Sequence, residues 1–214
     1  MPVTQEDMRR RGWDAPDFVY VCGDAYVDHP SFGHAIISRV LEQPGYKVAM
    51  LCLPPHQDAS AFQRFGKPKL AFLVSAGVID SMVNHYTAAK KPRSEDVYAP
   101  GGAAGLRPDR ATIVYCNRIR QAYSDVPILI GGVEASLRRF SHYDYWEDKV
   151  RHSILVDSGA NLLMYGMGET SVLACAAWLK NGANHEALRN IRGICYLDKE
   201  KPEGVIVQYG GQTP

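Results

Sequence analysis

The sequence predicts an α/β fold in which helices cover both faces of a parallel sheet of about five strands. Short, continuous apolar runs rich in β-branched residues recur along the 214 residues and end at Gly, Pro or Asp, as strands buried on both faces do. Stretches with helical spacing of apolar residues lie between these runs, where a parallel sheet requires crossover connections.

Each element follows from its own pattern. Five apolar runs predict the strands, at residues 18–22, 46–53, 70–75, 126–130 and 162–165. Apolar residues with helical spacing follow three of them and predict helices at 36–41, 80–86 and 169–180, the last ending before Gly182. Residues 113–123 fit a helix, although their β-branched start also fits a strand.

Two segments lack such patterns. Residues 88–109 contain no apolar periodicity, so we expect a long loop, either a lid or a plain surface insertion. The tail holds two short candidate strands, 193–197 and 204–208, in the order of a hairpin. We therefore divide the chain into an α/β domain at 1–190 and a small extension at 191–214.

Composition argues against several classes of protein. The 24 basic and 23 acidic side chains nearly cancel, which disfavours nucleic acid or an anionic membrane as a partner. No apolar run approaches the roughly 20 residues that span a bilayer, and residues 1–11 are too polar for a signal peptide, so we expect a cytoplasmic protein. The five cysteines lie scattered, mostly in apolar runs, so we expect small buried side chains rather than a metal or iron–sulfur site.

Ligands of open parallel sheets bind beyond the carboxyl ends of the strands. The loops expected there are rich in glycine, which lets a backbone approach a ligand closely. A valine at Gly132 should block such a site without harming the fold, provided that the φ angle of Gly132 is negative. We predict a cofactor-binding cleft that is bordered by Gly33, Gly131, Gly132, Ser136, Gly168 and Glu169.

The loop after the first strand collects side chains that could bind a divalent metal and activate water, namely Asp24, Asp28, His29 and His34. Asp is also an ordinary turn and capping residue, and no fixed spacing supports a metal site here. We therefore expect no tight metal binding and keep a metal-dependent hydrolase as an alternative function.

Residues 136–153 interleave basic and aromatic side chains, among them Arg138 and Trp146. This combination can bind nucleic acid. Acidic residues such as Asp144 and Glu147 cancel most of the charge, however. The interpretation that we prefer is a segment that packs against another domain or covers an edge of the sheet.

Three motifs occur in order: Pro-x-x-Gly at 30–33, Gly-Gly-x-x-x-Ser at 131–136 and Gly-x-Gly-Glu at 166–169. Together they resemble the N-terminal cobalamin-binding-like domain of radical S-adenosylmethionine (SAM) proteins, which is flavodoxin-like. The whole chain is most similar to the uncharacterised bacterial YgiQ group, especially at 24–33 and 134–146.

The resemblance implies a longer protein that binds SAM and holds a [4Fe-4S] cluster on a Cys-x-x-x-Cys-x-x-Cys loop. These residues lack that spacing, so we expect an N-terminal piece whose catalytic radical SAM barrel follows Pro214. Family members that bind cobalamin through an imidazole carry Asp-x-His-x-x-Gly. Here Asp28 and Gly33 keep that frame, so the resemblance adds Asp28 to the predicted cofactor-binding residues, but Pro30 replaces the His.

The loop could therefore bind cobalamin without an imidazole ligand, bind another nucleotide-like tail, or keep only the fold. We predict that the domain serves substrate or cofactor binding in a radical SAM enzyme of unknown substrate. A non-catalytic docking module is the other alternative to this function.

Overall fold

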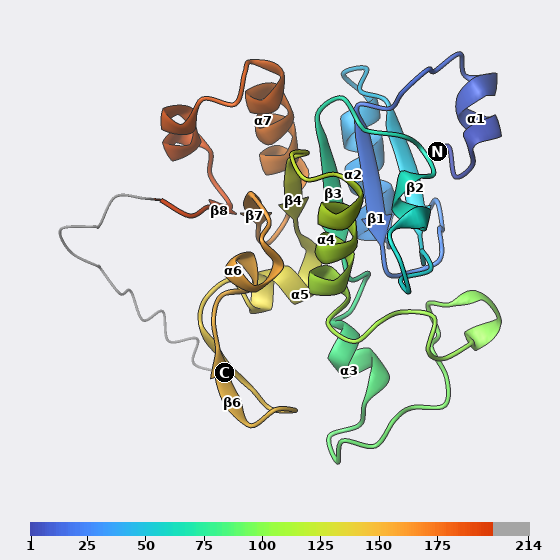
Figure 1. Ribbon diagram of the computed structural model, residues 1–214, viewed down its shortest axis with the longest axis vertical. Helices are drawn as coiled ribbons and strands as arrows, with labels where there is room; N and C mark the ends of the chain where they lie inside the picture. Colours follow the sequence, from blue (N-terminus) through green and yellow to red (C-terminus); the bar gives the residue numbers. More distant parts are fainter. Residues whose placement is uncertain (199–214) are drawn as a thin grey trace.

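The computed structural model describes residues 1–198 and contains the expected doubly wound sheet (Figure 1). The central sheet has the strand order β2-β1-β3-β4-β7-β8; its first five strands are parallel, and β8 is antiparallel to β7. This order confirms the predicted flavodoxin-like α/β class. The strand bounds are β1 Phe18–Cys22, β2 Val48–Cys52, β3 Ala71–Ser75, β4 Ile128–Ile130, β7 Leu162–Met164 and β8 Ile194–Cys195.

Helices connect the strands and cover both faces of the sheet. The α-helices are α1 Gln5–Arg10, α2 Gly33–Glu42, α3 Ser81–His85, α4 Ala111–Ala122, α5 Gly132–Leu137, α6 Ile154–Ser158 and α7 Glu169–Lys180. Three 3-10 helices are η1 Ser60–Gln63, η2 Pro100–Gly102 and η3 His185–Asn190. Within residues 1–198, no helix has the length and apolar character that crossing a membrane requires.

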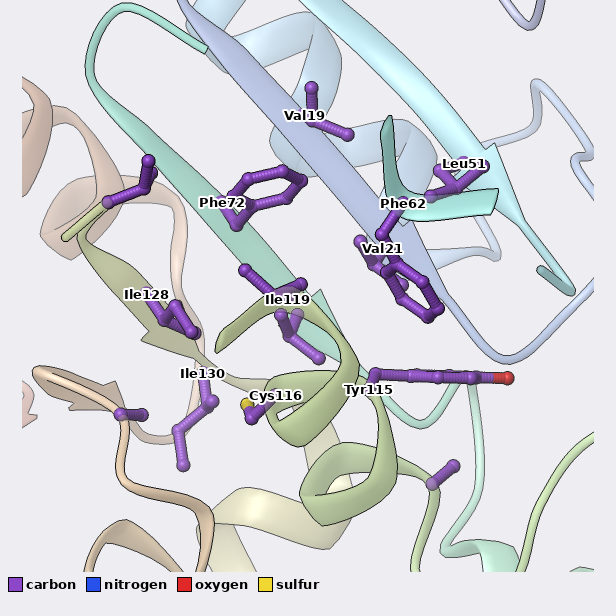
Figure 2. Close-up of a cluster of buried hydrophobic side chains, with 14 of the residues drawn as sticks. Val19, Val21, Leu51, Phe62, Phe72, Tyr115, Cys116, Ile119, Ile128 and Ile130 are labelled. Carbon is purple, nitrogen blue, oxygen red and sulfur yellow. The ribbon is translucent and has the colours of Figure 1, made fainter. Parts of the chain in front are cut away.

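The alternation of side chains along β1 divides the core into two layers. Val19 and Val21 point to the face that α4 covers, and Tyr115 and Ile119 of α4 belong to the same buried cluster (Figure 2). Tyr20 points to the opposite face, where α2 and α7 pack. Both faces of the sheet are therefore buried, which explains why the strands read as continuous apolar runs.

The structure differs from the sequence prediction mainly at short elements. The sequence patterns do not predict α1, α5 and α6, which have only five or six residues each and, unlike the equally short α3, are not marked by an apolar period. They also miss a separate antiparallel hairpin, β5 His142–Asp144 with β6 Lys149–Arg151. Of the two candidate strands in the tail, the first shortens to β8 and joins the central sheet. The second, at 204–208, and the end of the predicted extension at 191–214 lie outside the described residues.

The parallel strands all end at one side of the sheet, which we call the C-terminal edge. Figure 1 shows α3, the loop after it and the β5–β6 hairpin grouped beyond this edge. The loop corresponds to the predicted one at 88–109 and contains η2 and isolated bridges. The C-terminal edge therefore collects the segments that follow the strands.

Candidate functional site

A cleft opens at the C-terminal edge between α2 and α7, with a volume of about 170 Å³. Apolar side chains from β1, β3, β4 and β7 form its floor. Its rim is formed by residues of the turns that follow β4 and β7, together with the first turns of α2 and α7. The glycines leave part of the rim without side chains, and Ile36, Ile37, Met167 and Glu169 also line the cleft.

Hydrogen bonds tie the turns of the rim to β3 and α5. The Gly131 N–H donates to the carbonyl oxygen of Val74 at 2.9 Å. Gly132 has a φ angle of +82°, which L side chains rarely adopt. The Gly166 N–H donates to Oγ of Ser136 at 3.2 Å and thereby links the turn after β7 to α5.

The structure brings most of the residues predicted to bind a cofactor to this cleft. Ser136 lies beside it through its bond to the rim, whereas Asp28 lies apart. The exposed Asp28 carboxylate pairs with the Arg39 guanidinium, whose Nε is 3.2 Å from Oδ1, and this pair holds the pKa of Asp28 below its usual range. The other predicted residues line the cleft, namely Gly33, Gly131, Gly132, Gly168 and Glu169.

Valine at Gly132 is the wrong probe of this cleft, because the φ angle of Gly132 is positive rather than negative. A Cβ there would also lie 3.3 Å from Cβ of Ser75, so a side chain would strain the fold. Gly168 is a better position, since its φ is −84°. A Cβ at Gly168 would meet only the flexible end of Ile37, with Cδ1 at 3.3 Å.

The four polar side chains of the first loop do not form one cluster. Asp24 and His34 are buried, whereas Asp28 and His29 are exposed. Among residues 1–198, the group of potential metal ligands whose atoms lie within 4.8 Å of one another is Cys22, Asp24 and His34. The four-residue metal centre of the hydrolase alternative is therefore not assembled.

Cys22 departs from the expected role of a small apolar side chain. Burial alone would raise the pKa of its thiol, but hydrogen bonds with Cys52 and His34 outweigh burial and lower the pKa well below its usual value. His34 Nδ1 lies 3.4 Å from Cys22 Sγ, and the Asp24 N–H donates to the same sulfur at 3.4 Å. The end of β1 therefore holds two acidic groups, Cys22 and Asp24, inside the protein.

Buried charges fasten the long loop to the strand ends. Arg107 is 1% exposed and lies between Asp24 and Asp96, with Nη2 at 2.8 Å and 3.2 Å from their carboxylate oxygens. Its Nη1 donates to the carbonyl oxygen of Ala76 at 2.7 Å. Burial, with a smaller contribution from Cys22, raises the pKa of Asp24 to about 6 although Arg107 opposes the shift. Arg107 therefore anchors the long loop to the ends of β1 and β3.

Glu134 is a second buried charge that the sequence analysis misses. Its carboxylate accepts hydrogen bonds from the Ser81 N–H at 2.8 Å, the Thr112 N–H at 3.0 Å and the Ser81 hydroxyl. A carboxylate at the first turn of a helix satisfies free N–H groups and suits the helix dipole. Glu134 of α5 thereby holds the starts of α3 and α4 together.

The aromatic and basic segment at 136–153 forms the end of α5 and the β5–β6 hairpin. Its charges pair with one another or with neighbours. Arg110 Nη2 lies 2.8 Å from Asp144 and 2.8 Å from Glu147, and Arg151 Nε lies 3.0 Å from Asp157. Paired basic groups offer little charge to phosphates, and the expectation that nucleic acid is not a partner stays a prediction.

The cysteines do not gather in one place. All five are free; Cys22 and Cys52 are neighbours across β1 and β2, whereas Cys116, Cys175 and Cys195 lie on α4, α7 and β8. Three or four thiolates usually hold an iron–sulfur cluster. The cysteines of the described residues therefore do not fit such a cluster.

Comparison with known proteins places the chain in a family. Residues 1–209 match the family described as Radical SAM N-terminal. A UPF0313 protein of Clostridium botulinum (strain Okra / Type B1) is 54% identical over 200 residues, which cover 94% of this chain and 31% of that protein. A UPF0313 protein of Clostridium perfringens (strain 13 / Type A) is 57% identical over 197 residues, which cover 92% of this chain and 30% of that protein.

No solved structure matches the chain. The chain spans about a third of the length of the curated relatives that it matches. The family match covers nearly all of the residues, and the relatives share more than half of them. The chain therefore belongs to the radical SAM N-terminal family, and its curated relatives are UPF0313 proteins.

Proposed function

We propose that this domain binds an elongated, nucleotide-like cofactor in the cleft between α2 and α7, as part of a radical SAM protein. Cobalamin, which carries a slender nucleotide tail, is the first candidate. The observation that carries the proposal is the glycine-lined cleft, to which the start of α2 and the turns after β4 and β7 contribute glycines. It lies at the C-terminal edge, where ligands of open parallel sheets bind.

The residues present fit the tail of such a cofactor. The cleft has an apolar floor, and side chains in place of the glycines would narrow it: a Cβ at Gly168 would already lie 3.3 Å from Ile37 Cδ1. The first loop offers no imidazole at Pro30, and the exposed His29 accepts the Ser31 N–H through Nδ1 at 3.1 Å. The tail would therefore bind without an imidazole of this loop as a cobalt ligand.

The cysteines of this chain do not fit an iron–sulfur cluster, so we assign the cluster, together with the SAM that it would cleave, to the rest of the polypeptide. In the relatives, that part makes up about two thirds of the length. When bound there, the cluster would supply the electron for reductive cleavage of SAM. We also propose a cytoplasmic location, because five free cysteines suit a reducing compartment.

A binding titration tests the cleft. We expect hydroxocobalamin to bind the wild-type chain with a Kd of about 10⁻⁶ M, with flavin mononucleotide and SAM as the other ligands in the titration. Gly168→Leu should weaken binding by about tenfold or more, because the side chain would occupy the cleft. The control is Ala177→Leu, which introduces the same side chain at an exposed position of the same helix and should bind like the wild type.

Circular dichroism would first verify that both variants are folded. An unchanged Kd in folded Gly168→Leu would mean that the ligand binds elsewhere. If the wild-type chain binds flavin mononucleotide or SAM more tightly than hydroxocobalamin, the cleft remains the proposed site and that ligand replaces cobalamin as the candidate. Failure of the wild-type chain to bind any of the three would contradict the proposal and favour a docking module without a cofactor.

A further inference from the structure

Exposed apolar side chains gather at the C-terminal edge. They come from the long loop, α5, the β5–β6 hairpin and the turn after β7, all of which follow the ends of parallel strands. Some are almost entirely in solvent: Met167 is 84% exposed, Val97 76% and Val150 74%. We use the name apolar edge for six of these side chains, those of Val97, Leu137, Phe140, Tyr143, Val150 and Met167.

Specific contacts join the segments that carry the apolar edge. The Tyr145 hydroxyl donates to the carbonyl oxygen of Ala88 at 2.7 Å, and Lys90 Nζ lies 4.7 Å from the centre of the Tyr145 ring. These contacts tie the hairpin to the long loop. The Arg139 guanidinium lies 4.9 Å from the Phe140 ring and 5.2 Å from the Tyr165 ring, which ties the start of the hairpin to the turn after β7.

Ion pairs between the core and these segments also hold the segments in place. Arg107 fastens the long loop to Asp24, and the Arg110 guanidinium fastens the hairpin to the start of α4 through Asp144. The apolar side chains are therefore presented to solvent by a fixed framework. An edge that exposes this many large apolar side chains is a candidate interaction surface.

We propose that the apolar edge is the surface on which the remaining part of a UPF0313 polypeptide packs. This inference rests on the proposed function, in which that part holds the iron–sulfur cluster and SAM. About two thirds of the length of the relatives lies outside the matched region, which is enough for a partner domain. The Arg110 and Arg151 guanidiniums beside the apolar edge pair with carboxylates, which leaves less charge for an anionic polymer, so the surface suits an apolar protein face better.

The position of the cleft agrees with this partner. Met167 belongs to the apolar edge and also lines the cleft. A body that covers Met167 and the hairpin would therefore also cover the mouth of the cleft. A ligand in the cleft would then lie between the two parts of the polypeptide, where its exposed end could reach the second part.

Hydrogen exchange of the full-length polypeptide, compared with this chain alone, tests the proposal. We expect amides of 97–106, 137–150 and 165–168 to exchange about tenfold more slowly in the full-length protein. Amides at the opposite edge of the sheet, at 43–47 and 66–69, should exchange equally in both. Slower exchange at the opposite edge instead, or no difference anywhere, would overturn the proposal.

Two exposed substitutions sharpen the experiment. Phe140→Asp with Val150→Asp should return the exchange of the apolar edge in the full-length protein to the rate of the isolated chain. The matched control is Lys69→Asp, an exposed residue before β3 at the opposite edge, which should leave the exchange as in the wild type. Core amides of β1 and β3 report in the same data whether each variant is folded.

The docking proposal and the cofactor proposal can fail independently of each other. If the isolated chain binds hydroxocobalamin but the apolar edge is not protected in the full-length protein, only the docking proposal fails. If the edge is protected but no ligand binds the cleft, only the cofactor proposal fails. Concentration-dependent protection of the isolated chain would assign the apolar edge to a second copy of the chain and would also overturn the docking proposal.

Discussion

The two sides of the C-terminal edge are built by opposite means. On the side of α2 and α7, glycine backbone and apolar side chains leave a cleft. On the side of α3 and the long loop, charged groups are buried, with Arg107 between Asp24 and Asp96 and with Glu134 at the helix starts. The contrast teaches that missing side chains open the cleft, whereas paired charges hold the loop side together. Substitutions on the loop side should therefore reduce stability, and substitutions on the cleft side should affect binding.

The largest expected effect comes from removing Arg107. Arg107→Met would leave Asp24 and Asp96 buried without their cation, and breaking a buried ion pair from one side typically costs about 3–5 kcal/mol. Urea unfolding followed by circular dichroism measures this loss. If Arg107→Met is too unstable to purify, Arg107→Lys should fold with a smaller loss, because it keeps the charge but not the fork of donors.

Lys67→Met is the matched control for Arg107→Met. Lys67 pairs with Asp125 at 2.9 Å, but both side chains are exposed, so the free energy of unfolding should not change measurably. Equal losses in the two variants would contradict the comparison between the buried charges and an ordinary surface pair.

The second prediction concerns the pH dependence of stability. The folded-state pKa of Asp24, about 6, lies above the usual value of an aspartate. As the pH falls, the Asp24 carboxylate is therefore protonated in the folded protein at a higher pH than in the unfolded chain. The contribution of Asp24 to the free energy of unfolding should therefore rise as the pH falls from 7 to 4, by an amount of order 2 kcal/mol. Asp24→Asn should lack this contribution.

Urea unfolding of both proteins at several pH values between 4 and 7 checks the sign. The free energy of unfolding of the wild type, relative to that of Asp24→Asn, should decrease as the pH rises through about 6. A relative increase over the same range would show that the ion pair with Arg107 outweighs the burial of Asp24, and the pKa of Asp24 would then be lowered.

The sequence predicts the sheet and the cleft better than the loop side, because their signals are local. Strands buried on both faces are continuous apolar runs, Gly131 and Gly132 follow β4 directly, and Gly168 ends the short turn between β7 and α7. Arg107 lies in a polar stretch, where arginines are mostly exposed. Its partner Asp24 is far away along the chain, so the ion pair exists only in the fold. The partners of Glu134 are distant in the same way.

The third prediction concerns Glu134. Glu134→Gln keeps the shape of the side chain but removes its charge. It also replaces one accepting oxygen by an NH₂ group, which donates and so cannot accept the N–H or hydroxyl hydrogen bond made there. We expect a loss of about 1–3 kcal/mol in the free energy of unfolding, as for other buried polar groups that lose a partner. The control is Glu95→Gln, at an exposed position of the long loop. A loss in Glu134→Gln no larger than in the control would mean that α3 and α4 do not depend on this carboxylate.

The smallest effect is expected at the cleft, where two adjacent glycines should respond differently to alanine. Gly131 has an extended backbone with φ −162°, and a Cβ there would have its nearest neighbour at 3.5 Å, the carbonyl oxygen of Met164. Gly131→Ala should therefore change the free energy of unfolding by less than about 0.5 kcal/mol. Gly132 has φ +82° and its Cβ would lie 3.3 Å from Ser75 Cβ, so Gly132→Ala should cost about 1–2 kcal/mol. Urea unfolding of both variants measures the difference. Equal losses would mean that the positive φ angle of Gly132 adds no cost for alanine, and that the turn after β4 does not require glycine for its conformation.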